Sequence, residues 1–268
     1  RTTRHLITLN WGVCSMQLVG QIIRVADVST ADCRQMLNLL RKNYDNVTCT
    51  EFDSDLDEKD WVILTREPNS GDVMGFSTQQ MYNQQTSEGP IKVLFSGDTI
   101  VNPKFWGSNP LAKLWGQLTL ALIDRYPHED LFWFLISKGY KTYRFLPVFF
   151  NEFFPRSATQ TPPWAVNVLH DIASAKFGDR YDSQHGIVRA ALDGCRLKSG
   201  VADISQRVSD PNVQFFQSAN PGHTRGDELC CLARLSRENF RPSAWKVIGP
   251  LNSGEFPLDP EPASGHVA

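Results

Sequence analysis

The chain has 268 residues, of which 41% are hydrophobic, which fits either one sizeable domain or a domain with a large extension. Its 27 basic and 29 acidic side chains give a formal net charge of -2, which offers no support for generic nucleic-acid binding. No apolar run reaches the roughly 18 residues of a membrane span. The longest run, LFWFLIS at 131–137, is typical of a buried strand.

The cysteines and the first twenty residues predict a cytoplasmic protein. The six cysteines are scattered, with no C-x-x-C pair and no regular spacing, so neither a zinc site nor a disulfide framework is expected. Polar residues interrupt the apolar content of residues 1–20, which therefore make a poor signal peptide. Reduced thiols and no metal are the resulting expectations.

The first elements are a strand and two helices. Alternating residues at 21–28 predict a strand, and Thr30 can cap a helix over 31–44. The capping-box pattern from Thr48 to Glu51 predicts a second helix, which is short and acidic.

Three consecutive strands are expected next. The runs at 61–67 and 73–82 flank a turn with proline, asparagine and glycine, which predicts a hairpin. A polar loop at 83–90 then leads to a strand at 91–101. Gly97 interrupts that strand, which indicates a bulge or a close approach by another group.

The second half of the sequence begins with the clearest helix, at 111–126, where apolar residues recur at offsets of three and four. The strand at 131–137 must be covered on both faces, because its apolar run is nearly unbroken. Aromatic residues at helical spacing follow in 140–154, and Pro147 can break that helix.

The chain after residue 155 carries weaker patterns. They predict a linker at 157–163, a helix at 163–178, turn-rich chain at 181–225 and a late strand at 226–235. We expect a core over 1–155, an extension over 156–246 whose late strand completes that core, and a mobile tail over 247–268, which is rich in proline, glycine and acid.

The turn before the clearest helix is a candidate anion site. Asn109 is a favoured N-cap residue, Pro110 a favoured first helical residue, and Gly107 lets the backbone approach a ligand. Unpaired N–H groups and the helix dipole at such a start suit a phosphate. An ordinary tight turn is the alternative.

The order of elements resembles the GNAT superfamily of N-acyltransferases over roughly residues 20–155. The resemblance implies an α/β (α+β) fold with a mixed, mainly antiparallel sheet flanked by helices. In that family a loop of pattern Q/R-x-x-G-x-G/A grips the pyrophosphate of acyl-CoA. The matching stretch is 106–111, where the first glycine is kept but the Arg/Gln and the later small residue are not. This departure favours a longer acyl-CoA or an acyl-carrier protein as donor. The donor-binding residues that the resemblance implies are Val101, Lys104, Trp106, Gly107, Ser108, Asn109 and Leu111.

The resemblance also implies two catalytic residues. Family members commonly use a tyrosine after the fifth strand to protonate the departing thiolate, and Tyr143 is the first candidate here, with Tyr140 beside it. Asp98, next to Gly97, can act as a base or bind the substrate amine; a satisfied strand-edge carboxylate is the alternative.

The leading hypothesis is therefore an acyltransferase that moves an acyl group from a thioester donor, acyl-CoA or acyl-carrier protein, to the amine of a small molecule or peptide. A GNAT-like binding module without catalysis is the second hypothesis, and a structural protein with a merely similar sheet is the third. The expected partners include neither nucleic acid nor a membrane.

Overall fold

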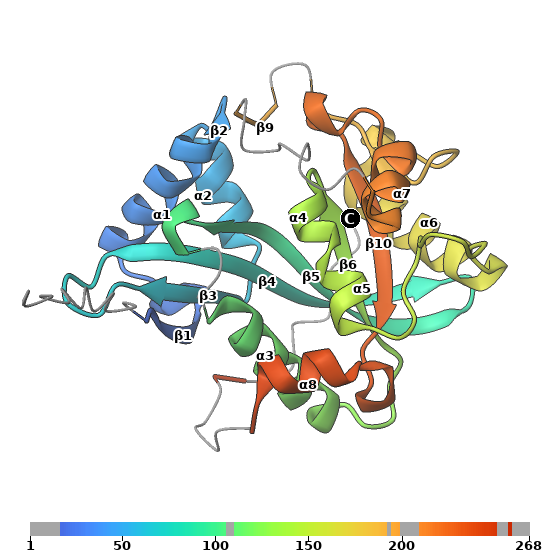
Figure 1. Ribbon diagram of the computed structural model, residues 1–268, viewed down its shortest axis with the longest axis horizontal. Coiled ribbons are helices and arrows are strands. Elements are labelled where there is room, and N and C mark those ends of the chain that lie inside the picture. The colour runs from blue at the N-terminus through green and yellow to red at the C-terminus, as the bar shows by residue number, and fades with distance from the viewer. Residues whose placement is uncertain (1–16, 106–109, 192–193, 199–208, 251–256, 259–268) are drawn as a thin grey trace, which may run out of the picture.

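The computed structural model describes residues 17–105, 110–191, 194–198, 209–250 and 257–258, and its centre is a mixed, mainly antiparallel sheet (Figure 1). The strand order is β1-β3-β4-β5-β6-β10-β8-β7, and only the β5–β6 pair is parallel. The predicted fold class is confirmed. The strands are β1 (Val19–Arg24), β3 (Trp61–Arg66), β4 (Val73–Thr86), β5 (Gly89–Val101), β6 (Leu131–Ser137), β7 (Tyr181–Asp182), β8 (Ile187–Val188) and β10 (Glu228–Arg234).

Both N-terminal helices are present, with one change of cap. Ser29, rather than Thr30, caps helix α1 (Thr30–Asn43), and its hydroxyl accepts a hydrogen bond from the Asp32 amide at 3.1 Å. Helix α2 (Cys49–Asp57) starts at the predicted capping box, where the Thr48 hydroxyl accepts from the Glu51 amide at 3.2 Å. A short pair of strands, β2 (Tyr44–Asp45) with β9 (Arg196–Leu197), links this region to the extension.

The hairpin of β4 and β5 is longer than the sequence predicts. The polar segment 83–90, expected as a loop, is mostly strand, because Tyr82–Thr86 continue the ladder opposite Gly89–Val93. The connection is only Ser87 and Glu88, and the Ser87 amide and hydroxyl both donate to Asp171 on helix α6 (Pro163–Phe177).

The helices after β5 also differ in detail from the expectations. Helix α3 (Leu111–Arg125) begins at the predicted residue, but Pro110 is in the capping position and not in the first turn. The predicted helix over 140–154 is two short helices, α4 (Tyr140–Tyr143) and α5 (Phe145–Phe149), and the chain is extended again from Phe150.

Helices cover both faces of the sheet (Figure 1). On one face, α1 and α2 pack over β3, β4 and the end of β5, and α6 packs over β5, β6 and β10. The opposite face is covered by α3, α4, α5, α7 (Pro211–Ala219) and α8 (Pro242–Ile248). This coverage explains why 131–137 is apolar throughout, since both faces of β6 are buried.

The extension contributes to the central sheet. The predicted late strand is β10, and it pairs antiparallel with β6 from Leu229–Ser137 to Arg234–Phe132. Ordered packing continues past residue 246, the predicted end of the extension, because Ile248 is buried against α3. Further on, the Pro257 carbonyl accepts a hydrogen bond from the Trp61 indole at 2.9 Å. None of the described helices is long and apolar enough to cross a membrane.

Candidate active site

The candidate site lies where β5 and β6 part. Their parallel ladder runs from Lys92–Leu131 to Ser96–Leu135 and then stops. Beyond it, Gly97–Val101 follow β4, while Ile136 and Ser137 follow β10. We call this region the strand divergence, and Figure 1 shows β4 with β5 and β6 with β10 running apart from a shared end. These two strands are therefore paired at one end and apart at the other.

A β-bulge marks the start of the divergence. Ser77 of β4 pairs with Thr99 and Gln79 pairs with Ser96, so Gly97 and Asp98 together oppose the single residue Thr78. A Cβ atom at Gly97 would lie 2.6 Å from the Thr78 hydroxyl oxygen. Both expectations for Gly97, a bulge and a close approach, are therefore confirmed.

Asp98 occupies this bulge in a charged but poorly hydrated setting. The pKa of its carboxyl is raised to about 6, mainly by burial and next by the neighbouring Asp55 of α2. Glu228 acts in the same direction, while Lys138 and Lys59 lower the pKa. A carboxyl that titrates near 6 can take a proton at neutral pH, as a general base must.

Lys138, directly after β6, carries the positive charge of this cluster. Its ammonium lies 3.7 Å from a carboxylate oxygen of Glu228 and 5.8 Å from the centre of the Tyr44 ring. Burial lowers the pKa of Lys138, but Glu228, with smaller contributions from Cys195 and Asp98, outweighs it, so the pKa is raised and the side chain stays charged. We call Tyr44, Asp55, Asp98, Lys138 and Glu228 the divergence cluster.

A short segment, Gly194–Lys198, crosses above the cluster and joins the two arms of the divergence. Its strand β9 pairs with β2, and the amide and ammonium of Lys198 donate to the carbonyls of Asn43 and Arg41 at 2.9 and 2.7 Å. On the other arm Leu197 packs beside Gly139. Cys195 lies in this segment, and burial raises the pKa of its thiol to about 11, although Lys138 opposes that rise.

The two candidate tyrosines both use their hydroxyl groups within the protein. Tyr143 is fully buried, and its hydroxyl donates to the carbonyl of Pro155 at 3.1 Å. The Tyr140 hydroxyl donates to the carboxylate of Asp210, the N-cap of α7, also at 3.1 Å. Burial raises the pKa of Tyr143. The role of Tyr143 as an acid stays a prediction.

The expected donor loop is described only at its edges. Trp106, Gly107, Ser108 and Asn109 lie outside the described residues, so their predicted roles stay predictions. Of the flanking residues, Val101 ends β5, Lys104 is exposed in a 3-10 turn at Pro103–Phe105, and Leu111 is buried at the start of α3. Because the Leu111 side chain is buried, only the main chain of this residue can contact a ligand.

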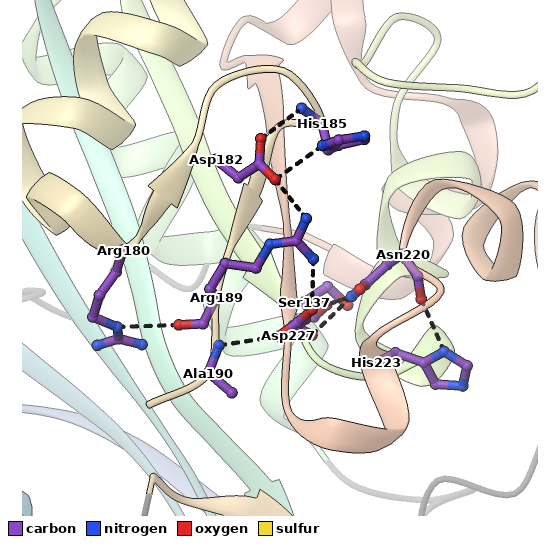
Figure 2. Close-up of polar contacts among 9 residues, drawn as sticks. All are labelled: Ser137, Arg180, Asp182, His185, Arg189, Ala190, Asn220, His223 and Asp227. Carbon is purple, nitrogen blue, oxygen red and sulfur yellow. Dashed lines mark hydrogen bonds and ion pairs between the residues drawn. The ribbon is translucent and has the colours of Figure 1, made fainter. Parts of the chain in front are cut away.

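A polar network holds the chain around Glu228 (Figure 2). Arg189 donates to the carboxylate of Asp227 at 2.8 Å and also contacts that of Asp182. Hydrogen bonds from Arg189 and His185 lower the pKa of the Asp182 carboxyl to about 2. Asp227 also accepts from the Ala190 amide at 3.0 Å. Because Asp227 precedes Glu228, this network fixes the start of β10 beside the divergence cluster.

Asn220 ties the same region to the end of β6 (Figure 2). Its side-chain amide donates to the carbonyls of Ser137 and Asp227 at 3.3 and 2.8 Å. The main-chain carbonyl oxygen of Asn220 lies 2.9 Å from Nδ1 of His223. Since a carbonyl oxygen only accepts, that nitrogen carries the proton. No metal site accompanies this network: within the described ranges, His, Cys, Asp and Glu form no cluster of three that can hold an ion.

Sequence reasoning found Asp98 but missed most of its neighbours. Tyr44 and Asp55 come from the α1–α2 region and Glu228 from β10, so only the folded chain brings them to the β5 bulge. Lys138 follows β6 in sequence, but its ion-pair partner Glu228 lies on β10. The one local signal was Gly97, which indicates the position of the bulge but not which side chains surround Asp98 there.

The topology around the divergence decides the fold class. A strand with a bulge leads through α3 to a parallel neighbour, the two strands then part, and an antiparallel strand closes the far side. The fold is GNAT-like. The two strands that part are β5 and β6.

Several solved GNAT structures are similar to part of this chain. A probable N-acyltransferase from Enterococcus faecalis V583 matches at 11% identity over 47% of this chain and 31% of its own, with a TM-score of 0.36. The Escherichia coli GNAT family N-acetyltransferase YhbS, in complex with CoA, matches at 14% identity, over 49% and 68% of the two chains, with a TM-score of 0.33. A Trypanosoma brucei acetyltransferase matches at 15% identity, over 55% and 97%, with a TM-score of 0.36.

These similarities leave the reaction open. This chain spans about a third of the length of the Enterococcus protein. Comparison with protein-family models gives no match, and comparison with curated proteins gives none either.

Proposed function

We propose that this protein is an acyltransferase, which moves an acyl group from a thioester donor to an amine. The observation that carries the proposal is the position of Asp98, a carboxyl with a pKa near 6, on the bulge where β5 leaves β6. It combines a group able to accept a proton at neutral pH with the place where a GNAT-like fold receives its donor.

The donor would lie along the strand divergence. Gly97–Val101 form no ladder with β6, so this stretch of β5 offers backbone on which the amides of a pantetheine arm can pair. Helix α3 starts just beyond the loop that follows β5, and its first turn suits a phosphate. Acyl-CoA fits these features, and an acyl-carrier protein presents the same arm.

The amine would approach from the α1–α2 side. Asp55, Asp98 and Glu228 on that side attract a protonated amine, and Lys138 balances part of their charge. Asp98 then takes one proton from the ammonium, and the free amine attacks the thioester carbonyl. A carbon–nitrogen bond forms, the carbon–sulfur bond breaks, and the leaving thiolate takes a proton. The acceptor is a small molecule or a peptide with a primary amine.

The proton for the thiolate is the least defined step. Tyr143 is our candidate for this acid, and its hydroxyl would have to exchange the Pro155 carbonyl for the sulfur. That requirement favours the second hypothesis, a GNAT-like binding module without catalysis, since the Tyr140 hydroxyl is engaged as well.

Free-thiol release from thioesters separates the two hypotheses. Purified protein is mixed with acetyl-CoA or longer acyl-CoAs and a panel of amines, and thiol is measured in the native protein and in Asp98→Asn. Amine-dependent release that Asp98→Asn removes supports the enzyme. A melting temperature that rises with CoA, without release for any pair, supports the binding module.

A further inference from the structure

A chain of side-chain hydrogen bonds crosses three strands of the sheet and ends at the strand divergence. The Trp133 indole N–H of β6 donates to the Ser96 hydroxyl of β5 at 2.9 Å, and Ser96 donates to the Gln79 carbonyl oxygen of β4 at 2.7 Å. The Gln79 amide nitrogen donates to the Ser77 hydroxyl at 2.7 Å. Ser77 and Thr99 complete the chain, with their hydroxyl oxygens 2.7 Å apart.

The first member fixes the direction of every bond that follows. An indole N–H only donates, so Ser96 accepts from Trp133 and sends its own proton to Gln79. Gln79 must then turn its amide nitrogen toward Ser77. Ser77 uses one lone pair for that bond, and Thr99 is the acceptor within reach of its proton.

These side chains are buried, so water cannot replace the partners in this chain of hydrogen bonds. Gln79 is 0% exposed, Ser96 3%, Trp133 4% and Ser77 5%. Each of these side chains therefore depends on its neighbour in the chain for hydrogen bonding. Thr99 is half-buried and is the only one of the five that reaches the surface.

The hydroxyl proton of Thr99 is thus available to a group outside this chain of hydrogen bonds. Thr99 lies on β5 beyond the bulge, in the stretch that no longer pairs with β6. In the part of the chain that the structure describes, no group other than Ser77 bonds to its hydroxyl. Its neighbour on the same face of β5, Val101, packs against the hydrophobic cluster that contains the buried residues of α3, so Thr99 lies on the α3 face of the sheet.

We propose that the Thr99 hydroxyl donates a hydrogen bond to a carbonyl oxygen of the acyl donor's pantetheine arm, and that Trp133 sets this direction through Ser96, Gln79 and Ser77. This inference rests on the proposed function. Pantetheine carries amide carbonyls and the acylated form adds the thioester carbonyl, so the arm offers acceptors that match a pre-oriented donor. Thr99 makes the contact itself, while Trp133 is a positioning residue.

Calorimetric titration of the full chain with CoA and with acetyl-CoA tests the contact. Thr99→Val keeps the shape of the side chain without its hydroxyl, and we expect donor affinity to fall roughly tenfold, the effect of one neutral hydrogen bond. Thr99→Ser restores the hydroxyl and should restore affinity. A loss with both ligands assigns the bond to a pantetheine amide, and a loss with acetyl-CoA alone assigns it to the thioester.

Two further variants separate contact from scaffold. Ser77→Ala breaks the chain before Thr99, and we expect a smaller loss of affinity, since Thr99 keeps its proton but not its orientation. Thr65→Val removes another buried hydroxyl of the same sheet, which donates to the Gly75 carbonyl at 3.2 Å, and should leave donor affinity unchanged.

The outcomes distinguish the inference from the function on which it rests. Native affinity in Thr99→Val overturns the inference, while the proposed acyltransferase stands as long as donor still binds. An equal loss in Thr65→Val and Thr99→Val also overturns it, because a general weakening of the sheet would then explain both. A native protein that binds neither CoA nor acetyl-CoA overturns the proposed function together with the inference.

Discussion

The hydroxyl of Tyr143 donates to the main-chain carbonyl of Pro155, 3.1 Å away, in a site with no exposed surface. This bond joins the short helix after β6 to Pro155, the residue at which the core was expected to end. Tyr143 therefore stabilises the junction of core and extension, whatever part it takes in chemistry.

Tyr143→Phe separates those two roles. We expect the free energy of unfolding to fall by about 1 kcal/mol, because the Pro155 carbonyl loses its buried partner. Urea denaturation measures that change. A residue that protonates the thiolate would also show a fall in kcat of about a hundredfold with donor affinity unchanged. Native kcat in this variant would exclude Tyr143 as the acid and leave water or another group to supply the proton.

Asp98→Asn should change stability in a pH-dependent way. The carboxyl has a pKa of about 6 in the folded chain against an ordinary value of 3.8, so the folded state holds the proton more tightly. The free energy of unfolding of the native protein therefore declines as pH rises from about 4 to about 6. Asp98→Asn removes this decline, so we expect the variant to be more stable by about 1–3 kcal/mol at pH 7 and equally stable below pH 4.

The same variant should alter the pH profile of turnover. An ionised Asp98 is the proposed base, so kcat/KM of the native protein should rise with pH through about 6 and then level off. The remaining activity of Asp98→Asn should lack this rise. A native profile that is flat from pH 5 to 8 would contradict the assignment of the base.

Gly97→Val should destabilise the bulge more than a comparable change elsewhere. A Cβ at Gly97 would lie 2.6 Å from the Thr78 hydroxyl oxygen and 2.8 Å from Cε of Lys59, so the bulge has to shift. We expect a loss of about 1–3 kcal/mol, measured by urea denaturation. Gly139→Ala is the control, since its nearest neighbour, Leu197, is 3.6 Å from the added atom. Equal losses in both would show that the bulge is not the tight point.

Arg189→Met should expose the dependence of β10 on its polar support. The Asp227 side chain is only 7% exposed, and this change leaves it with the Ala190 amide but no cation. We expect a loss of about 2–4 kcal/mol in the free energy of unfolding. Arg180→Met, which removes only a bond to the Arg189 carbonyl at 3.2 Å, should cost much less. Similar costs for both would contradict the structural role of the Arg189–Asp227 pair.

The pattern of apolar residues predicted the elements that pack into the core. Helix α3 and strand β6 matched their expected ranges closely, because their apolar spacing is set by the core that they help to form. The ends of β4 and β5 were missed for the opposite reason. Residues 83–90 are polar and partly exposed, and what makes them strand is their pairing with each other.

The site was predictable only where a local rule applied. Gly97 marked the bulge, because a glycine inside a strand costs stability unless something needs its space. Tyr44, Asp55 and Glu228 carry no such mark, since each is an ordinary residue of its own element. The series of side-chain hydrogen bonds from Trp133 to Thr99 could not be predicted from the sequence either, because its members lie on three different strands.

Strand β10 has a consequence for the order in which this protein forms during synthesis. Strand β6 finds β5 early, but its other edge waits for Glu228–Arg234, which leave the ribosome much later. Until then the apolar strand Leu131–Ser137 presents an open edge, the feature that promotes association between chains. Such long-range pairing makes folding slow. Chains halted before residue 228 should therefore be the ones that aggregate and engage chaperones.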